Sequence, residues 1–389
     1  MIKLPIYLDY AATTPVDAQV IAKMLEFLGD YGQFGNPASL THAYGKAASH
    51  AVQTAREQVA ELIGGEASEI IWTSGATESV NLALKGAAQL YQGQGKHIVT
   101  FKTEHKAVLD TCQQLEKMGF TVTYLATLPN GLIDLAKFSE ALRNDTILVS
   151  VMQVNNEIGV IQDVDAIAQL TASRGILLHV DAAQSIGKLA IDVQRTPIDL
   201  MSLSAHKIYG PKGIGALYVR RKPRVRVAPL IHGGGQELGM RSGTLPTHQI
   251  AAMGEAYRIA QTRMAADYQH SANLRALFLE RIASCRNFTV LGDASHTYPG
   301  ILNICFKDQL AKSLIKLLPE LAIATGSACV NNSDEPSYVL RALGLSNEVA
   351  QSALRFSFGR FTTPAEIDFA AATIIKLLIT DNYKIKVEE

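Results

Sequence analysis

The segments ILLHVDAAQS (residues 176–185) and LMSLSAHKIYGPKG (residues 200–213) decide the fold. Each opens with an apolar run that is long enough for a strand and ends in a polar or glycine-rich turn. Continuous apolar runs of this length are typical of parallel strands that helices cover on both faces. We therefore predict two neighbouring buried strands at residues 176–180 and 200–203.

The same alternation of apolar runs and amphipathic stretches extends outward from these segments over residues 68–219. Further strands are predicted at residues 69–73, 97–103 and 146–154. Further helices are predicted at residues 78–91 and 164–174. Strands that alternate with helices indicate an α/β fold with a mostly parallel sheet. Ligands of such sheets collect at the carboxyl ends of the strands.

The character of the sequence changes beyond about residue 261. A long helical stretch at residues 264–282 precedes a shorter mixture of strand and helix patterns. We predict a large domain of residues 16–262 and a smaller α/β domain that residues 1–15 and 263–389 form together.

The overall charge excludes several classes of partner. The 36 Lys and Arg residues balance 36 Asp and Glu residues, so no global field indicates direct binding of nucleic acid or of a membrane surface. The four cysteines form no CxxC pair, and we expect no intrinsic metal site. No stretch has the pattern of a signal peptide or the length of a membrane span. We expect a cytoplasmic protein.

Lys207 and Asp181 are the first candidates for chemistry. A lone lysine in a loop is usually a solvated charge, but Asp181 ends an apolar strand and is costly to bury without a partner. Lys207 follows 26 residues later, about one helix-and-strand crossover along the chain. A lysine for a Schiff base and a carboxylate for a pyridinium nitrogen are what pyridoxal 5'-phosphate (PLP) chemistry requires.

The segment TSGATE (residues 73–78) links a predicted strand to a predicted helix, and it includes Ala76 and Thr77. A helix N-terminus offers free N–H groups to a phosphate. An ordinary capping box explains the same residues equally well. The P-loop and dinucleotide-binding glycine patterns are both absent, which favours PLP over a nucleotide.

Other polar residues follow strand ends, namely His105, Asn156 and Gln184. A histidine at such a position is suited to stacking on a flat ring, although a lone histidine is more often structural. Cys329 lies in a segment of small and polar residues and is the reactive thiol candidate. Cys112, Cys285 and Cys305 lie in apolar periodic stretches that are typical of a core.

Seven segments resemble the group I cysteine desulfurases, of the IscS- or NifS-like type: LDYAATTP (8–15), FGNPAS (34–39), SGATES (74–79), TEHKAV (103–108), VNNEIG (154–159), HVDAAQS (179–185) and GSAC (326–329). The resemblance runs from about residue 8 to residue 363. It implies the type I fold of the class V PLP-dependent aminotransferases and a homodimer. It implies that sulfur from L-cysteine becomes a persulfide on Cys329, with release of L-alanine.

The resemblance also implies a role for each matching residue. Lys207 would hold the cofactor's aldehyde, Asp181 would pair with the ring nitrogen, and His105 would stack on the ring and move protons. Gln184 and Asn156 would contact the ring oxygen. The phosphate contacts would be Ala76, Thr77, Ser204, His206 and, from the second protomer, Thr244. The substrate contacts would be Asn36, Asn156 and Arg355.

The family further implies protein partners. The sulfur would pass to acceptors such as an iron–sulfur cluster scaffold or carriers for tRNA thiolation, and Cys329 could transiently ligate a cluster that it shares with the scaffold. Acidic regulators would dock on the basic run from Arg220 to Arg226. Three features depart from the family pattern: Ala205 replaces a glycine, polar residues occupy 331–334, and the C-terminal tail is short.

Two alternatives remain open at this stage. Another class V PLP enzyme, such as a selenocysteine lyase or an aminotransferase, would need Lys207 and Asp181 but not Cys329. A scaffold without a cofactor in sulfur trafficking would need none of the three residues.

Overall fold

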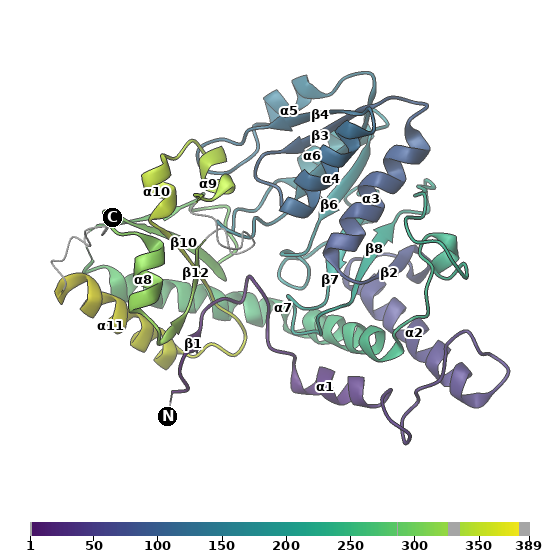
Figure 1. Cartoon of the computed structure of the whole chain (residues 1–389), viewed down its shortest axis with the longest axis horizontal. Coiled ribbons are helices and arrows are strands. Elements are labelled where there is room, and N and C mark those ends of the chain that lie inside the picture. The colour runs from purple at the N-terminus through teal and green to yellow at the C-terminus, as the bar shows by residue number, and fades with distance from the viewer. Residues whose placement is uncertain (1, 286, 326–334, 381–389) are drawn as a thin grey trace.

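The computed structural model describes residues 2–285, 287–325 and 335–380, and Figure 1 shows their arrangement. Among these residues, seven strands form the main sheet in the order β2-β8-β7-β6-β5-β3-β4. They are β2 (Ile70–Thr73), β3 (His97–Phe101), β4 (Thr121–Leu125), β5 (Thr146–Met152), β6 (Leu177–Asp181), β7 (Leu200–Ser204) and β8 (Gly215–Val219). All neighbouring pairs from β7 to β4 are parallel, whereas β8 runs antiparallel to both of its neighbours. The predicted α/β class with a mostly parallel sheet is confirmed.

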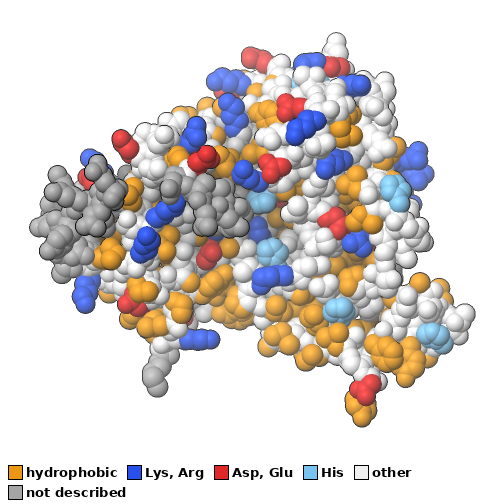
Figure 2. All heavy atoms as spheres, viewed as in Figure 1, with side chains coloured by type: hydrophobic (Ala, Val, Ile, Leu, Met, Phe, Trp, Pro, Cys, Tyr) orange, Lys and Arg blue, Asp and Glu red, His pale blue; other side chains and the backbone are white. Residues whose placement is uncertain are grey.

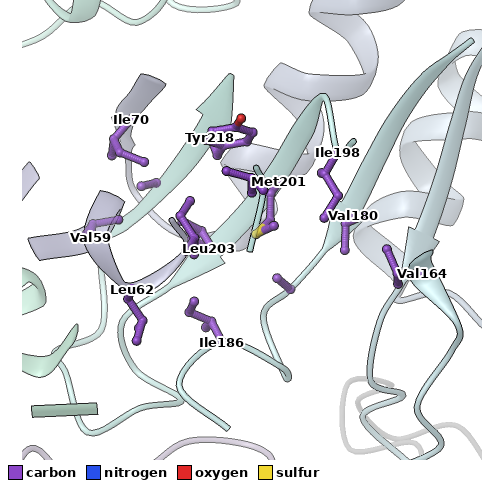
Figure 3. Packing of buried hydrophobic residues seen from close by; sticks show 14 of the residues in the cluster. Val59, Leu62, Ile70, Val164, Val180, Ile186, Ile198, Met201, Leu203 and Tyr218 are labelled. Atoms are coloured by element: carbon purple, nitrogen blue, oxygen red, sulfur yellow. The ribbon is translucent and has the colours of Figure 1, made fainter. Parts of the chain in front are cut away.

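Helices cover both faces of the main sheet. On one face, α3 (Ala76–Tyr91) and α4 (Lys106–Lys117) bury residues such as Leu82 and Leu115. On the other face lie α2 (Ala43–Leu62), α5 (Leu135–Ala141), α6 (Val164–Ala172) and the first half of α7 (Thr247–Ile282). Figure 3 shows this second layer, where Val59 of α2 and Val164 of α6 pack against Val180, Met201 and Leu203 of the central strands.

The alternation of side chains along β6 explains on which face of the sheet its polar residues lie. Leu178 and Val180 of β6 belong to the core beneath α2, α6 and α7. Because successive strand residues point to opposite faces, His179 and Asp181 must lie on the face that α3 covers. Ser150 and Ser202 hydrogen-bond the two ring nitrogens of buried His179, at 2.9 and 2.8 Å. Burial lowers the pKa of His179 to about 4, so the ring is neutral and structural.

A second sheet has the order β12-β13-β10-β9 and is antiparallel. Its strands are β9 (Phe288–Leu291), β10 (Ile301–Phe306), β12 (Ala324–Thr325) and β13 (Ala353–Ser357). The remaining helices are α1 (Ala18–Leu25), α8 (Ala311–Leu317), α9 (Tyr338–Ala342), α10 (Asn347–Gln351) and α11 (Pro364–Thr380), with short 3-10 turns at Ala67–Glu69 and Glu237–Gly239.

The N-terminal segment packs with the second sheet. Strand β1 (Ile6–Tyr7) pairs with β11 (Leu321–Ala322) in parallel, and Ile6 and Leu8 share a core with Phe278, Phe356 and Ile367. The boundary predicted at residue 262 falls inside α7, a helix of 36 residues that extends from one sheet to the other. The division into two domains stays a prediction.

The long helix begins earlier than the sequence pattern indicated, at Thr247 instead of residue 264. Its first half buries Ile250, Ala252, Met253, Ala256 and Tyr257 on several sides. Because this half is buried on most of its sides, its apolar residues show little of the amphipathic period of a surface helix, and the pattern gave no signal before residue 264.

Candidate active site

A cavity of about 410 Å³ opens at the carboxyl ends of β5, β6 and β7, against the N-terminus of α3. Because the three strands are parallel and in register, their carboxyl ends lie side by side at the cavity. Asp181 lies beside Met152 of β5 and Ser202 of β7. Eight of the predicted site residues line this cavity: Ala76, Thr77, His105, Asn156, Asp181, Gln184, His206 and Lys207. The structure thus brings together residues that are up to 131 positions apart in the sequence, from Ala76 to Lys207.

Asp181 and Lys207 occupy the positions that their strands dictate. Asp181 is the last residue of β6 and is 4% exposed, and its Oδ1 accepts a hydrogen bond from the Ala183 N–H at 2.9 Å. Lys207 follows the end of β7 by three residues and faces the same cavity. A buried carboxylate and a lysine on neighbouring strand ends can serve a ring nitrogen and an aldehyde.

His105 is the N-cap of α4. Its Nδ1 accepts a hydrogen bond from the Ala107 N–H at 3.1 Å, which places the proton of a neutral ring on Nε2. Burial lowers the pKa of His105, the positive charge of Lys207 lowers it further, and Asp181 opposes both effects. His105 is therefore a neutral imidazole in the cavity wall near neutral pH.

The N-terminus of α3 is not closed by a capping side chain. Its N-cap is Gly75, which has φ +151° and makes no side-chain cap, so the capping-box interpretation of this segment is wrong. The Ser74 N–H donates instead to Glu78 at 2.7 Å, and the Arg241 guanidinium also donates to Glu78, at 2.8 Å. Although burial alone would raise it, the hydrogen bonds from Arg241 and Ser74 lower the pKa of Glu78.

The first turn of α3 can therefore receive an anion. The N–H groups of Ala76 and Thr77 belong to the four that no helix can pair internally, and the helix dipole favours negative charge beside them. His206 lines the same cavity, and burial together with the charges of Lys207, Lys212 and Lys188 lowers its pKa to about 4. Lysine charges and free amides are the donor set that a phosphate requires.

Ser204 and Arg355 lie next to the cavity rather than in its lining. Ser204 is fully buried, and its Oγ has no hydrogen-bond partner among the described residues. Arg355 of β13 is 2% exposed and donates to the Asn156 carbonyl at 2.9 Å and to Asp9 Oδ1 at 2.7 Å. Within the same part of the chain, Arg355 Nε and Asn156 Oδ1 are also buried without partners. Unsatisfied buried polar atoms are costly, so these Ser204, Asn156 and Arg355 atoms beside the cavity need an explanation.

Asn36 and Thr244 are not at this cavity. They line a separate cavity of about 260 Å³ together with Arg56 and Glu237. Arg56 holds Glu237 through two hydrogen bonds of 2.8 Å each, and Glu237 also accepts the Trp72 N–H of edge strand β2. The structure thus brings Asn36 and Thr244 together with each other but not with Lys207.

Several cavity residues lie in or near the quoted segments but were not predicted as site residues. Ala12, Ser74, Lys212, Gly213 and Ile214 line the cavity. Lys212 and Gly213 belong to the turn after Lys207, and that proximity is the signal that could have found them. Ala12 comes from the N-terminal segment, which only the tertiary fold brings to the strand ends.

Two buried glutamates next in sequence to the lining residues His105 and Asn156 were also missed. Burial raises the pKa of Glu157 to about 7, against the opposing effects of Ser337 and Arg355. Burial raises the pKa of Glu104 well above its usual range, although the Met152 N–H donates to it at 2.9 Å. Both residues adjoin predicted site residues in sequence, but their burial could not be read from the pattern.

The basic run requires a correction. Arg220 was predicted to be part of an exposed docking surface, but it is buried, and its guanidinium donates to the carbonyls of Val193, Thr196 and Ile198. These hydrogen bonds fix the backbone of the loop that precedes β7. The exposed members of the run are Arg221, Lys222, Arg224 and Arg226.

Three further observations concern Cys329, metals and membranes. Cys329 lies outside the described residues. The described part of the chain holds no cluster of three or more His, Cys, Asp or Glu side chains that could bind a metal ion. None of the helices in that part combines the length and the apolarity that a membrane crossing needs.

The fold and the cavity define the class of protein. Residues 6–369 match the family described as Aminotransferase class-V. A solved NifS-like protein superposes with a TM-score of 0.90 at 34% identity, covering 96% of this chain and 99% of the other. The structure titled "SspA in complex with cysteine" gives a TM-score of 0.81 at 40% identity, covering 92% of this chain and 99% of the other.

Curated relatives narrow the class. The cysteine desulfurase IscS of Vibrio vulnificus (strain YJ016) is 61% identical over 372 residues, which cover 96% of this chain and 92% of the relative. That of Escherichia coli O139:H28 is 59% identical over 374 residues, covering 96% and 93%. The chain therefore belongs to the cysteine desulfurase family of the class-V aminotransferases, and the resemblance noted in the sequence is confirmed.

Proposed function

We propose that this cysteine desulfurase binds PLP in the cavity at the ends of β5, β6 and β7 and takes sulfur from L-cysteine. The observation that carries the proposal is the joint lining of one cavity by Lys207, Asp181 and His105. The IscS relatives and the cysteine complex of a solved neighbour support the same substrate.

The residues present fit PLP. The open N-terminus of α3 and His206 suit its phosphate, Asp181 suits its ring nitrogen, and Lys207 suits its aldehyde. When bound, PLP supplies an electrophilic carbon and a ring that accepts electrons from the substrate. Asp181 would stabilise a proton on the ring nitrogen, and His105, which lines the cavity, would help to exclude water from it.

The chain's own groups carry the proton and sulfur transfers. Lys207 removes the proton from Cα of cysteine and later returns a proton to the product. The Cys329 thiolate forms a bond to the substrate sulfur while the Cβ–S bond breaks. The electron pair of the broken Cβ–S bond stays on Cβ. This carbon takes up a proton and becomes the methyl group of L-alanine, which is then released. The net reaction converts L-cysteine and the Cys329 thiol into L-alanine and a persulfide.

Arg355 suits the substrate carboxylate. Its guanidinium contacts the Asn156 carbonyl, and Asn156 lines the cavity. The Arg355–Asp9 ion pair of 2.7 Å holds the fork in place. Arg355 Nε has no partner among the described residues. The guanidinium can therefore bind a carboxylate without losing both the Asn156 and the Asp9 contacts.

We further propose a homodimer. Exposed apolar side chains gather on α1 and the segment that follows it: Ile21, Leu25, Leu28, Tyr31, Phe34, Leu40 and Tyr44. Figure 2 shows hydrophobic side chains along this lower edge of the molecule. A contiguous exposed apolar surface of this kind is typical of a protein interface. Asn36 and Thr244 lie beside it, in position to complete a partner's site.

The proposed activity has a direct assay. We expect the PLP-loaded protein to release L-alanine from L-cysteine without any keto acid, and to produce sulfide when a thiol reductant is present. A strict requirement for a keto acid would identify an aminotransferase instead. Turnover of selenocysteine but not of cysteine would identify a selenocysteine lyase, and a protein that binds no PLP would be a scaffold.

We propose that the sulfur passes to protein acceptors, such as a cluster scaffold or tRNA-thiolation carriers, and that acidic partners dock on Arg221, Lys222, Arg224 and Arg226. The three arginines of this set, Arg221, Arg224 and Arg226, line a cavity of about 420 Å³ beside Pro229 and Met240. Such a cluster of positive charge attracts acidic proteins and accelerates their association. The location in the cytoplasm also stays a prediction.

Reversing two of these charges tests the docking surface. The double variant Arg224→Glu and Arg226→Glu is expected to bind a small acidic electron-transfer protein about tenfold more weakly at low salt, and with a flatter salt dependence. Lys117→Glu with Lys137→Glu is the matched control, because it makes the same charge change on α4 and α5, near the opposite edge of the sheet. Equal binding by both double variants would rule out this surface.

A further inference from the structure

Lys188 is a partly buried lysine that the proposed reaction does not use. It follows Gln184 by four residues, and its Nζ donates a hydrogen bond to Gln184 Oε1 at 2.8 Å. The same Nζ lies 5.3 Å from the centroid of the Tyr298 ring, which is a cation–π contact. Burial lowers the pKa of Lys188 to about 7, helped by the charges of Lys207 and Arg355. A buried amine is costly, so its contacts need a reason.

We propose that Lys188 is a positioning residue: it fixes the orientation of the Gln184 amide so that an N–H of Gln184 faces the ring oxygen of bound PLP. The inference rests on the proposed function, since it assumes that PLP occupies the cavity that Gln184 lines. It adds to that function a residue that touches neither substrate nor cofactor but acts through one that does.

The hydrogen bonds of Gln184 determine which side of its amide group carries the oxygen and which carries the nitrogen. An ammonium group only donates hydrogen bonds, so the Gln184 atom beside Lys188 must be the oxygen. On the other end, Gln184 Nε2 donates to the Ala11 carbonyl at 2.7 Å, and a carbonyl only accepts. The two partners require the same orientation. If Lys188 is neutral, its amine still has an N–H to donate to Gln184 Oε1. Without Lys188, the Ala11 carbonyl holds the amide by its nitrogen alone, and the oxygen end loses the donor that fixes its direction.

The fixed orientation matters because a glutamine nitrogen carries two N–H groups. One N–H is used by Ala11, so the second is the donor that Gln184 can offer to a ligand in the cavity. The ring oxygen of PLP is an acceptor and carries negative charge. A flipped amide would direct its own oxygen toward that charge, which would repel it.

The same contacts link two parts of the site. The Ala11 N–H donates to Ser357 Oγ at 2.8 Å, and Ser357 lies two residues after Arg355 on β13. A continuous path of hydrogen bonds therefore runs from Lys188 through Gln184 and Ala11 to the strand that carries the proposed carboxylate fork. Loss of Lys188 removes the first member of this path.

The test uses apo protein that is titrated with PLP, together with the pH dependence of the visible absorption of the loaded protein. Lys188→Met keeps the length of the side chain but cannot donate. We expect it to bind PLP about tenfold more weakly, the effect of one lost hydrogen bond to a charged group. We also expect the pH midpoint of its visible band to rise, because a ring oxygen with one donor fewer holds the proton that it shares with the Lys207 nitrogen more tightly.

Two further variants separate positioning from folding. Lys188→Arg restores a donor and is expected to return the pH midpoint toward the wild-type value. Gln184→Glu keeps a partner for Lys188 but replaces the N–H with an acceptor, and is expected to raise the midpoint even if Lys188→Met does not fold. Lys117→Met, which removes an exposed lysine of α4 outside the cavity lining, is expected to leave the midpoint unchanged.

The outcomes distinguish this inference from the proposed function. If the wild-type protein fails to bind PLP, the proposed function itself is wrong. If the wild-type protein binds PLP but a folded Lys188→Met leaves the pH midpoint unchanged, the role of Lys188 is wrong and the function stands, whatever Gln184→Glu does. If Lys188→Met does not fold, an unchanged midpoint in Gln184→Glu overturns the role of Lys188 in the same way.

Discussion

Replacement of Lys207 by alanine is expected to lower turnover of L-cysteine by about a hundred- to ten-thousandfold, the range typical of a lost general base. The purified variant is also expected to hold no covalently attached PLP. Lys207 lies in the same cavity as Asp181, beside the neighbouring strand end, and the proposed function assigns to it the bond to the aldehyde and the transfer of the Cα proton. Absorption spectra of the purified protein and an alanine assay measure the two effects.

Lys212 offers a matched control for this variant. It lines the same cavity but is exposed, and it belongs to the turn after Lys207. We expect Lys212→Ala to keep the visible absorption band and to retain activity within about tenfold of the wild type, as loss of one exposed charge predicts. A Lys207→Ala protein that keeps the band and turns over cysteine would contradict the assignment.

The convergence of Asp181 and Lys207 on one cavity could be predicted from the sequence, for a physical reason. Asp181 and Lys207 each follow a continuous apolar run, and the carboxyl ends of parallel strands meet at one edge of a sheet. Polar residues at such ends therefore converge wherever the strands lie in the sheet. The structure places both residues, with His105 and Asn156, around one cavity.

The sequence pattern failed where burial depends on distant partners. Arg220 follows β8 as the first residue of a basic run, but it turns inward because three carbonyls of residues 193–198 accept its protons. Arg355 pairs with Asp9, which is 346 residues away in the sequence. Glu157 accepts a hydrogen bond from Ser337, 180 residues away. No local period encodes such pairs.

Replacement of Cys329 is expected to have the second large effect on activity. Replacement by serine is expected to leave PLP binding intact and to abolish persulfide formation, with release of alanine falling at least about a hundredfold, since a hydroxyl is a far weaker nucleophile than a thiolate. In the proposed function, the steps before sulfur transfer depend on Lys207 and the cofactor and not on Cys329. Serine is nearly isosteric with cysteine, so the loss is expected to be chemical rather than structural.

The other cysteines are poor competitors for this role. Cys112, Cys285 and Cys305 are all buried, and burial raises the pKa of each thiol, to about 12 for Cys112. A thiol with a raised pKa supplies little thiolate near neutral pH. Cys285→Ala serves as the control for removal of a cysteine and is expected to form the persulfide as the wild type does.

Intact-mass analysis after incubation with L-cysteine, run beside an alanine assay, tests the account most directly. The wild-type protein is expected to gain the mass of one sulfur atom, to release one alanine for each sulfur gained, and to lose the added mass on reduction. Cys329→Ser is expected to gain no sulfur and to release almost no alanine. A sulfur adduct that persists in Cys329→Ser, or full alanine release from that variant, would contradict the assignment of Cys329 as the sulfur carrier.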